Sequence, residues 1–585
     1  MDTTVTPTDA TLPLRIGGFT SLAEALDYAA RGSTGYNFHS GRAEHYATLT
    51  YSDLRAGALD LACRLSGLGL ARGARVAFVA DTNPDVIRFF FACQYAGVVP
   101  VPLSASLHLG SQRAYVTQLR HLLASCGAEA AMAPPAFLPY VKQAAEGLPL
   151  RFLGEPAAFD DLAASGEELR ALGPEDTAYL QYTSGTTRSV RGVVVTQAAL
   201  MNNLTGILNH GLAIRAGDRA VSWLPYYHDM GFVGLVLAPM ASQVSVDCMS
   251  ATEFAKRPLQ WLTLISKTRG TIAFSPTFGY ELCAQRLRGE EIERLDLSAW
   301  RVAGVGAEMV RPDALEQFAD RFAAAGFDRR AFVACYGMAE CSLAVSFSPL
   351  DTGLRVDRID RVRLAESRIA LPIDDTPADA EVGRFVNCGQ ALPGFEVEVR
   401  DEEGHALPAR RCGTVFVRGP SVNPGYFADT AATDEVLSPD GWLDTGDLGY
   451  RVGGSLVITG RRKDLLIING RNIWPQDLEY IAAQQAEVRG RAAAAFSVPA
   501  PGGEEMAAMV VQCRVADPAQ RAALVERLQT AILEEIGVRC LIELVPPHTL
   551  PRTSSGKLSR AGARADFLQR LQGAAPPVAW SPRLR

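Results

Sequence analysis

A short turn rich in hydroxyl groups and glycine contains the residues whose chemistry is easiest to interpret. It extends from Tyr182 to Gly192, between two apolar runs, so we expect a turn that joins two strands. Glycine lets the backbone approach a ligand closely, and hydroxyl and N–H groups donate hydrogen bonds to phosphate oxygens. The turn lacks the Gly-Lys-Ser/Thr ending of a Walker A loop. Taken alone, it fits a polyphosphate site and an ordinary surface turn equally well.

Six further segments combine polar and aromatic residues at places where strands are expected to end or turn. Each is weak evidence alone, because an aspartate or lysine in such a place is usually an ordinary surface residue. In chain order the segments are 222–231, 306–308, 335–340, 445–447, 460–464 and 551–557.

Together and in this order, the seven segments resemble the motifs of the adenylate-forming superfamily. This superfamily includes acyl-CoA synthetases, luciferases, adenylation domains of peptide synthetases and fatty acyl-AMP ligases. The resemblance extends from about Leu49 to Arg560. It implies a large N-terminal domain, a small mobile C-terminal domain and an ATP-dependent reaction. A carboxylate attacks the α-phosphate of ATP, which gives an acyl-adenylate and pyrophosphate, and a thiol then usually takes the acyl group.

The reaction brings one anion to another, so catalysis must neutralise charge and fix an in-line geometry. The resemblance assigns the β- and γ-phosphates to the opening turn, through Thr183, Ser184, Gly185, Thr186 and Thr187. It assigns Mg²⁺, which prefers oxygen ligands, to Glu340 and Thr186. Lys557 corresponds to the lysine that bridges carboxylate and α-phosphate oxygens in the transition state. The alternatives are a Glu340 that only complements a helix N-terminus and a Lys557 that is a flexible surface residue.

A second set of residues is expected to bind the adenosine part of ATP. By the resemblance, these are Ala307, Glu308, Tyr336, Gly337, Met338, Asp447 and Arg461. The ring of Tyr336 is expected to lie against adenine, and Asp447 is expected to accept hydrogen bonds from the ribose hydroxyls. Arg461 corresponds to a second contact with ribose or phosphate.

Two residues have competing interpretations. His228 resembles a histidine near the acyl entrance and the α-phosphate, where it would be catalytic. A core histidine hydrogen-bonded by Asp229 is nearly as good an interpretation. Asp464 falls at the family's hinge, where few residues absorb the rotation of the C-terminal domain. It could instead cap a turn.

The acyl group is expected to lie among largely apolar and aromatic segments. The residues expected around it are Tyr227, Met230, Gly231, Ser275, Thr277, Phe278 and Gly304. We see no aspartate placed like the one that anchors an α-amino group in amino-acid-activating relatives. A fatty acid is therefore the expected substrate.

Several features resemble the fatty acyl-AMP ligase branch of the superfamily. Arg188 and the preceding Leu180-Gln181-Tyr182 look like that branch's version of the phosphate loop. A long stretch at about 346–384 matches the position of an insertion that, in this branch, packs on the large domain and hampers the rotation needed for transfer to CoA. The alternative is a surface excursion without a role.

The elements that must position these residues follow from hydrophobic patterning. Alternating helix-like and strand-like segments up to Gly337 indicate βαβ units and a mostly parallel sheet. Short strands over 384–460 indicate a small β-barrel subdomain. The predicted fold is thus α/β, with an adenylation domain over 1–463 and an α+β lid domain over 464–585. Predicted elements include helices from Pro84 to Tyr95 and from Pro518 to Ile536.

Composition narrows the class of protein. With 585 residues the chain is too long for one core, and its net charge of −7 and lack of a basic stripe argue against a nucleic-acid partner. Its eleven cysteines include no Cys-x-x-Cys pair, which favours free thiols in a reducing cytoplasm. The polar start is not a signal peptide, and no apolar run is long enough to span a membrane.

The leading hypothesis is a fatty acyl-AMP ligase that uses ATP and Mg²⁺ and delivers acyl groups to a phosphopantetheinylated acyl carrier protein. The carrier could also be a domain of a polyketide or peptide synthetase. The alternative is a fatty acyl-CoA synthetase. A non-catalytic acyl or nucleotide sensor is a more remote possibility, which the retention of Glu340, Asp447 and Lys557 disfavours.

Overall fold

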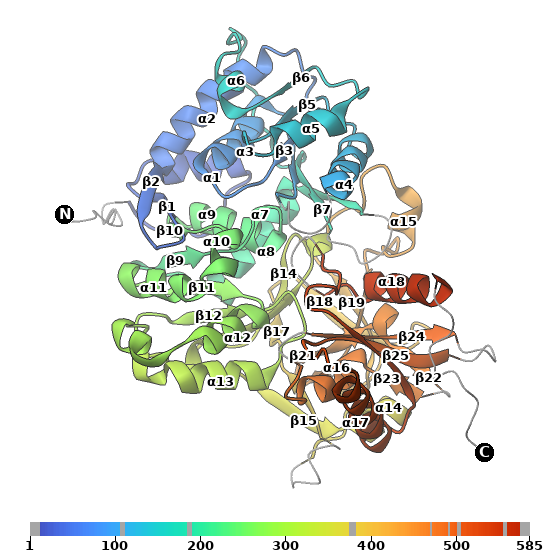
Figure 1. The fold of residues 1–585 in the computed structure, drawn as a ribbon. Coiled ribbons are helices and arrows are strands. Elements are labelled where there is room, and N and C mark those ends of the chain that lie inside the picture. The colour runs from blue at the N-terminus through green and yellow to red at the C-terminus, as the bar shows by residue number, and fades with distance from the viewer. Residues whose placement is uncertain are drawn as a thin grey trace.

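The computed structural model describes residues 12–105, 112–183, 190–373, 382–468, 471–488, 492–499, 505–553 and 558–573 (Figure 1). Parallel sheets covered by helices form the N-terminal part, and a smaller α+β part follows. This arrangement confirms the predicted α/β class.

A four-stranded parallel sheet with strand order β4-β3-β5-β6 lies in the N-terminal part, drawn blue and cyan in Figure 1. Helices cover both faces of this sheet, and side chains that alternate along β3 pack against one layer and then the other. Val76 and Phe78 pack with α2 and α3, whereas Ala77 and Val79 pack with α4 and α5. The elements are α1 Leu22–Ala29, α2 Tyr51–Ser66, β3 Arg75–Val79, α3 Pro84–Ala96, β4 Val99–Leu103, α4 Gln112–Ser125, β5 Ala130–Met132, α5 Leu138–Ala145, β6 Phe152–Gly154 and α6 Pro156–Asp160.

A nine-stranded sheet with strand order β17-β14-β13-β12-β11-β9-β10-β1-β2 forms the centre of the molecule. Its six inner strands, from β13 to β1, are parallel, and β2, β14 and β17 join antiparallel at the edges. The strands are β1 Gly35–His39, β2 His45–Thr50, β9 Arg219–Ser222, β10 Ser245–Cys248, β11 Ile272–Ser275, β12 Val302–Val305, β13 Phe332–Gly337, β14 Ala344–Phe347 and β17 Gln390–Ala391. The associated helices are α7 Gln197–Gly206, η1 Ile207–Gly211, α8 Asp229–Phe232, η2 Val233–Leu237, α9 Ala238–Ala241, α10 Ala251–Lys256, α11 Leu259–Thr268, α12 Thr277–Arg286 and α13 Pro312–Phe322.

The apolar runs around the opening turn form the predicted pair of strands. They are β7, Thr177–Tyr182, and β8, Gly192–Thr196, which pair antiparallel. The turn itself, at 184–189, lies outside the described residues.

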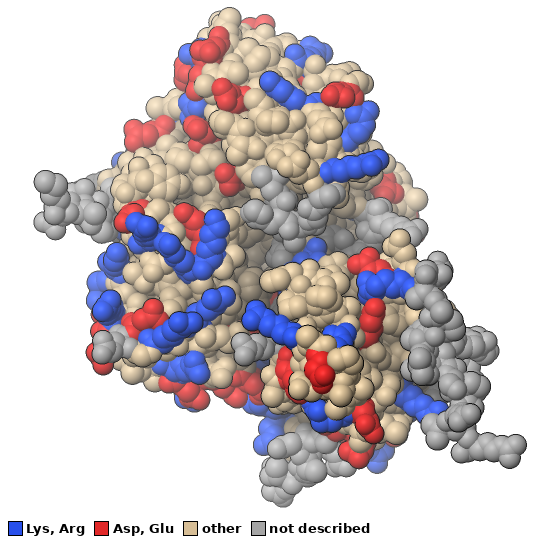
Figure 2. Space-filling view, in the orientation of Figure 1, with Lys and Arg blue, Asp and Glu red and all other residues tan. Residues whose placement is uncertain are grey.

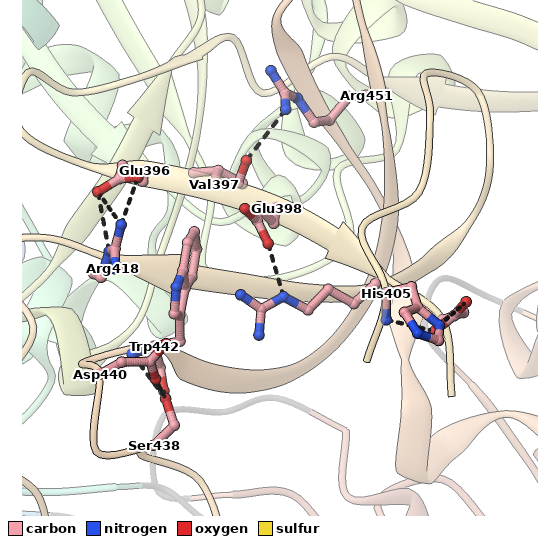
Figure 3. A network of polar contacts seen from close by, with 11 residues as sticks. Glu396, Val397, Glu398, His405, Arg418, Ser438, Asp440, Trp442 and Arg451 are labelled. Carbon is pink, nitrogen blue, oxygen red and sulfur yellow. Dashed lines mark hydrogen bonds and ion pairs between the residues drawn. The ribbon is translucent and has the colours of Figure 1, made fainter. Parts of the chain in front are cut away.

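The segment predicted as a β-barrel forms a four-stranded antiparallel sheet, β18 Glu396–Arg400, β19 Gly413–Arg418, β20 Leu443–Val452 and β21 Ser455–Arg461. Figure 3 shows polar contacts on this sheet, including the ion pair between Arg418 and Glu396 at 2.8 Å. The Trp442 ring centroid lies 4.5 Å from Cζ of Arg400 and 4.8 Å from Cζ of Arg418. Two guanidinium groups thus contact the indole ring and link β18 and β19 to the residue that precedes β20.

The predicted insertion is a hairpin of β15 Val356–Asp360 and β16 Val382–Val386, with α14 Arg361–Ser367 between its strands. The insertion begins later than the predicted residue 346, because Ser346 and Phe347 belong to β14 of the central sheet. The hairpin lies at the lower edge of the view in Figure 1, below α13.

The C-terminal part has separate hydrophobic clusters around a three-stranded sheet, β24-β25-β26. Ala493 and Ala495 of β24 pack in the cluster that contains α16 and α17, whereas Ala494 and Phe496 pack with α18. The elements are β22 Leu466–Ile468, β23 Arg471–Ile473, α16 Pro475–Ala483, β24 Ala493–Pro499, β25 Glu505–Gln512, α17 Pro518–Ile536, β26 Cys540–Val545 and α18 Arg560–Gly573. An additional short helix, α15 Thr430–Asp434, precedes β20.

Basic and acidic side chains are interspersed on the face shown in Figure 2. None of the helices in the described part of the chain combines the length and apolar character that a membrane crossing requires.

Candidate active site

A cavity of about 1500 Å³ lies between the central sheet, the four-stranded sheet and the C-terminal part. Residues from the ends of β7 and β13, from β20 and β21, and from α16 contribute to its wall. Thr553, Leu558 and Arg560 contribute from the C-terminal part. The cavity therefore brings together segments that are more than 300 residues apart in sequence, as Thr183 and Thr553 are.

One wall is built around the carboxylate of Asp447. The Tyr336 hydroxyl donates a hydrogen bond to Oδ2 at 2.8 Å, and Nε of Arg461 lies 3.2 Å from Oδ1. Asp447 also donates its backbone N–H to Thr445 at 3.1 Å. Asp447 and Arg461 are register partners in β20 and β21, which explains why the two side chains meet. Asp447 holds the pKa of Arg461 above its usual value.

A second carboxylate, Glu340, lies on the same wall in the short helix η6 (Ala339–Cys341), just after β13. The Tyr426 hydroxyl donates to its Oε1 at 2.8 Å, and Cζ of Arg191 lies 5.1 Å from the Tyr426 ring centroid. Burial raises the pKa of Glu340, and the hydrogen bond from Tyr426 opposes that rise. The Tyr426 hydroxyl therefore fixes a half-buried carboxylate that faces the cavity.

The loop after β12 places Ala307 and Glu308 on the cavity wall. Ala307 has a φ of +66°, a conformation that residues other than glycine rarely adopt. The carboxylate of Glu308 accepts a hydrogen bond from the backbone N–H of Phe278 at 3.1 Å, in the first turn of α12. Glu308 thus connects this loop to the beginning of that helix. Gly337 and Met338 also line the cavity.

The structure places His228 on the cavity wall and beside Asp229, and its catalytic role stays a prediction. Its Nδ1 lies 2.7 Å from Oδ1 of Asp229. It also caps α8, because Nδ1 accepts a hydrogen bond from the backbone N–H of Met230 at 3.3 Å. These contacts orient the imidazole ring at the edge of the cavity.

The apolar part of the wall differs in part from the expected acyl pocket. Tyr227 and Met230 line the cavity as expected. Phe274, Leu343 and Phe347 line it as well. The first two belong to segments expected around the acyl group, 272–280 and 338–345, whereas Phe347 was not predicted. Five expected residues do not appear among the described residues of the wall: Gly231, Ser275, Thr277, Phe278 and Gly304.

Gly304 nevertheless determines the shape of this wall. A Cβ atom at this position would lie only 2.0 Å from the ring of Phe274, so the glycine leaves the room that the ring occupies. The Phe274 ring in turn lies 6.5 Å from that of Phe347, in an edge-on arrangement. Aromatic side chains of β11 and β14 thus form a packed apolar surface in the cavity that the two carboxylates also line.

The expected phosphate turn, Thr183 to Thr187, and the expected catalytic lysine make up six residues. Five of them lie outside the described residues: Ser184, Gly185, Thr186, Thr187 and Lys557. The sixth, Thr183, lines the cavity, as does Arg191 beyond the turn. Thr553 and Leu558, on either side of the undescribed 554–557, also line it.

The described residues contain no cluster of three or more His, Cys, Asp or Glu side chains that could hold a metal ion. Glu340 contributes one carboxylate to the wall, outside any such cluster among the described residues. Mg²⁺ is commonly held by one or two carboxylates together with substrate phosphates, so this oxygen donor fits Mg²⁺ bound to ATP.

The predicted hinge residue, Asp464, lies at the end of η8 (Arg462–Asp464) and lines the cavity. Its Oδ2 accepts a hydrogen bond from Nη1 of Arg560 at 2.9 Å. Sequence reasoning missed both Arg560 and Tyr426. Arg560 is near Lys557 in sequence, which is a signal that could have drawn attention to it.

Comparison with known proteins agrees with this geometry. The sequence profile described as "AMP-binding enzyme" matches residues 27–427. A protein of Caulobacter vibrioides named "Putative acyl-CoA synthetase" is 45% identical, covering 97% of this chain and 99% of the relative. A medium-chain-fatty-acid–[acyl-carrier-protein] ligase of Moorena producens is 30% identical, covering 94% of this chain and 95% of the relative.

A solved structure from work on fatty acyl-adenylate ligases of E. coli and L. pneumophila superimposes with a TM-score of 0.92. It is 45% identical and covers 96% of this chain and 100% of its own. The chain therefore belongs to the AMP-binding enzyme family of adenylate-forming ligases, within which it falls with the fatty acyl-AMP ligases.

Proposed function

We propose that this ligase activates a medium- or long-chain fatty acid with ATP and then transfers the acyl group to the phosphopantetheine thiol of an acyl carrier protein. The observation that carries the proposal is the presence of two kinds of lining in one cavity. Asp447 and Glu340 contribute carboxylates to its lining, and Phe274 and Phe347 contribute aromatic rings. Such a cavity suits a nucleotide together with a molecule that has an apolar chain and a carboxylate.

The polar residues of the lining suit the adenylation step. Asp447, oriented by Tyr336, accepts hydrogen bonds from the ribose hydroxyls, and Arg461 contributes positive charge beside the phosphates. Glu340 and Thr186 would hold Mg²⁺, which supplies further positive charge to the phosphate oxygens. Lys557 neutralises the developing charge between the fatty acid carboxylate and the α-phosphate. Loss of one such preorganised donor typically costs about 3–4 kcal/mol of transition-state stabilisation.

The apolar residues of the lining suit a hydrocarbon chain. Each methylene group that leaves water contributes about 0.8 kcal/mol, so the depth of the apolar wall would set the preferred chain length. The relative from Moorena producens is named for medium-chain fatty acids, which supports a chain of this class.

The insertion supports a carrier protein as acceptor. Arg384 of β16 forms ion pairs with Asp313 and, at 2.8 Å, with Glu316, both of α13. On the other side, Asn472 of β23 donates a hydrogen bond to the backbone oxygen of Ala365 at 3.2 Å. The insertion therefore contacts both the large domain and the C-terminal part. Such contacts would restrict the rotation that transfer to CoA requires.

Transfer to CoA is the second candidate, and the name of the relative from Caulobacter vibrioides favours it. The first test is pyrophosphate exchange into ATP with fatty acids of graded length. Exchange that depends on the fatty acid supports the first half-reaction. The absence of both exchange and acyl-adenylate with every fatty acid would contradict the proposal and favour a sensor.

A further inference from the structure

Arg560 joins three segments of the chain through one guanidinium group. Its Nε and Nη2 donate to the two carboxylate oxygens of Glu479, both at 2.7 Å, and its Nη1 donates to Asp464 at 2.9 Å. We refer to these three residues as the Arg560 cluster. The three hydrogen bonds are charge-assisted, and those to Glu479 have the bidentate geometry that arginine favours.

The cluster is well shielded and well anchored. The side chains of Arg560, Asp464 and Glu479 are 20%, 21% and 16% exposed. Oε1 of Glu479 also accepts a hydrogen bond from the backbone N–H of Ala495 in β24, at 3.1 Å. Burial disfavours the charge on Arg560, but Glu479 and Asp464 more than offset this and hold the pKa of Arg560 above its usual value. The Arg560 guanidinium therefore stays charged throughout the physiological pH range.

The Arg560 cluster lies at the wall of the cavity in which we place the reaction. All three of its residues line the cavity, together with Thr553 and Leu558. Arg560 is the first residue of α18 and follows Lys557 by three positions. Asp464 lies three residues after Arg461, which contacts Asp447. The cluster thus connects the segment that follows Arg461 with the beginning of α18, which follows the predicted catalytic Lys557 in sequence.

We propose that Arg560 is a positioning residue that holds the first turn of α18, and Leu558 just before it, at the cavity by binding Glu479 and Asp464. This inference rests on the proposed adenylation function, because it assigns Arg560 to that half-reaction. Arg560 does not itself contact ATP or the fatty acid. Its loss slows the adenylation step and leaves substrate binding nearly unchanged, because the residues that bind ATP and the acyl chain belong to the large domain.

The chemistry of the cluster makes the effect specific to arginine. Lysine has one compact ammonium group and cannot bridge both oxygens of Glu479 and Asp464 with a planar fork. Without any cation, Glu479 and Asp464 are two neighbouring carboxylates that repel each other. A displacement of about 1 Å in a catalytic group costs about 10²-fold in rate.

The test compares Arg560→Lys and Arg560→Gln with the wild type in the adenylation assay. We expect kcat to fall about tenfold or more in Arg560→Gln and less in Arg560→Lys, while KM for ATP and for the fatty acid stays within about threefold. Glu479→Gln should change the same parameters in the same direction. A matched fall in kcat and rise in KM, or wild-type kcat in Arg560→Gln, would overturn the proposal.

Arg570→Gln is the matched control. Arg570 lies on the same helix and forms an equivalent bidentate pair with Glu543, at 2.8 and 2.7 Å, but it is absent from the described wall of the cavity. Its replacement should leave kcat unchanged. If Arg570→Gln lowers kcat as much as Arg560→Gln does, the effect is general to α18 and the proposal fails.

Hydrogen–deuterium exchange gives a readout that does not need activity. Arg560→Gln should accelerate amide exchange in the first turn of α18 and around Asp464, whereas unchanged exchange there contradicts the proposal. A wild-type protein that forms no acyl-adenylate would refute the proposed function, and the exchange result would still show whether Arg560 holds these segments. Arg560→Lys serves if Arg560→Gln does not fold.

Discussion

The Tyr336 hydroxyl donates a hydrogen bond to Oδ2 of Asp447 at 2.8 Å and so joins the end of β13 to β20 at the cavity. We predict that Tyr336→Phe raises KM for ATP about tenfold, because a hydrogen bond to a charged group contributes roughly 1.5–3 kcal/mol and Arg461 keeps part of the orientation. The measurement is KM for ATP at saturating fatty acid.

Tyr450→Phe is the control for this prediction. The Tyr450 hydroxyl donates to Asp357 at 2.7 Å, also from β20, but neither residue belongs to the described wall of the cavity. Its replacement should leave KM for ATP unchanged. Equal values for Tyr336→Phe and the wild type would show that the orientation of Asp447 does not depend on Tyr336.

The contact between Gly304 and Phe274 predicts a change in chain-length preference. A Cβ atom at position 304 would force the Phe274 ring to move, and the cavity is the open space beside it. Gly304→Ala should therefore shift the preference toward shorter fatty acids. Each excluded methylene should lower kcat/KM roughly fourfold, which corresponds to about 0.8 kcal/mol.

A second substitution distinguishes this steric effect from general damage. Phe274→Leu in the Gly304→Ala background should restore activity with the longer chains, because the smaller side chain accommodates the new methyl group. A uniform loss of activity with all chain lengths, not relieved by Phe274→Leu, would contradict the predicted position of the acyl chain.

A buried ion pair between strands of the central sheet predicts an acid-sensitive contribution to stability. Asp247 is 1% exposed, and its carboxylate contacts Arg219 at 2.5 Å and His39 at 2.9 Å. Burial raises the pKa of Asp247, but His39 and Arg219 outweigh it, so the pKa lies below its usual value. The stabilising contribution is therefore present above the unfolded pKa of about 3.9 and is lost as pH falls through the lower folded pKa.

Asp247→Asn should lower the free energy of unfolding by roughly 3–5 kcal/mol at neutral pH, because it leaves Arg219 buried without a carboxylate. Urea unfolding at a series of pH values measures this, and the difference from wild type should shrink in acid. Asp320→Asn, which breaks an ion pair between residues 67% and 68% exposed, should change stability by less than about 1 kcal/mol. Similar effects of the two substitutions would show that the buried ion pair contributes no more to stability than the exposed one.

The register of the insertion defines the ends of a deletion, although Leu364 and Ala370 within it are buried in a hydrophobic cluster. Asp360 of β15 pairs with Val382 of β16, so residues 361–381 can be replaced by an Asn-Gly turn. The deletion removes α14 and with it the hydrogen bond from Asn472 to Ala365. If the insertion restricts rotation of the C-terminal part, the variant should gain transfer to CoA while retaining adenylation.

Asn472→Ala removes only that hydrogen bond and should produce a smaller gain. A deletion variant that adenylates normally and still rejects CoA would show that the acceptor is selected elsewhere, for example by the shape of a thiol channel.

Elements with local signals could be predicted from the sequence. Asn83 caps α3, Pro84 begins it and Gly97 ends it with a φ of +71°. Likewise Asp517 caps α17 and Gly537 ends it, and the predicted helix from Pro518 to Ile536 matches its bounds. Such signals lie within a few residues of the element that they define, which is why they can be recognised without the fold.

Contacts between distant segments could not be predicted in this way. Tyr426 and Glu340 are 86 residues apart, and Arg560 and Asp464 are 96 apart, so no local pattern connects them. The apolar wall presents a related difficulty. Phe274 in the cavity wall and Phe78 in the core are both aromatic residues within a strand, and only the fold distinguishes them.

The most direct test of the central claim is a competition between acceptors. The protein is supplied with ATP, Mg²⁺ and its preferred fatty acid, and then with equal concentrations of CoA and a holo-acyl carrier protein. We predict that the acylated carrier protein forms at least about tenfold faster than acyl-CoA, a difference of about 1.4 kcal/mol in barrier height. Equal rates, or faster formation of acyl-CoA, would contradict the assignment of a carrier protein as acceptor.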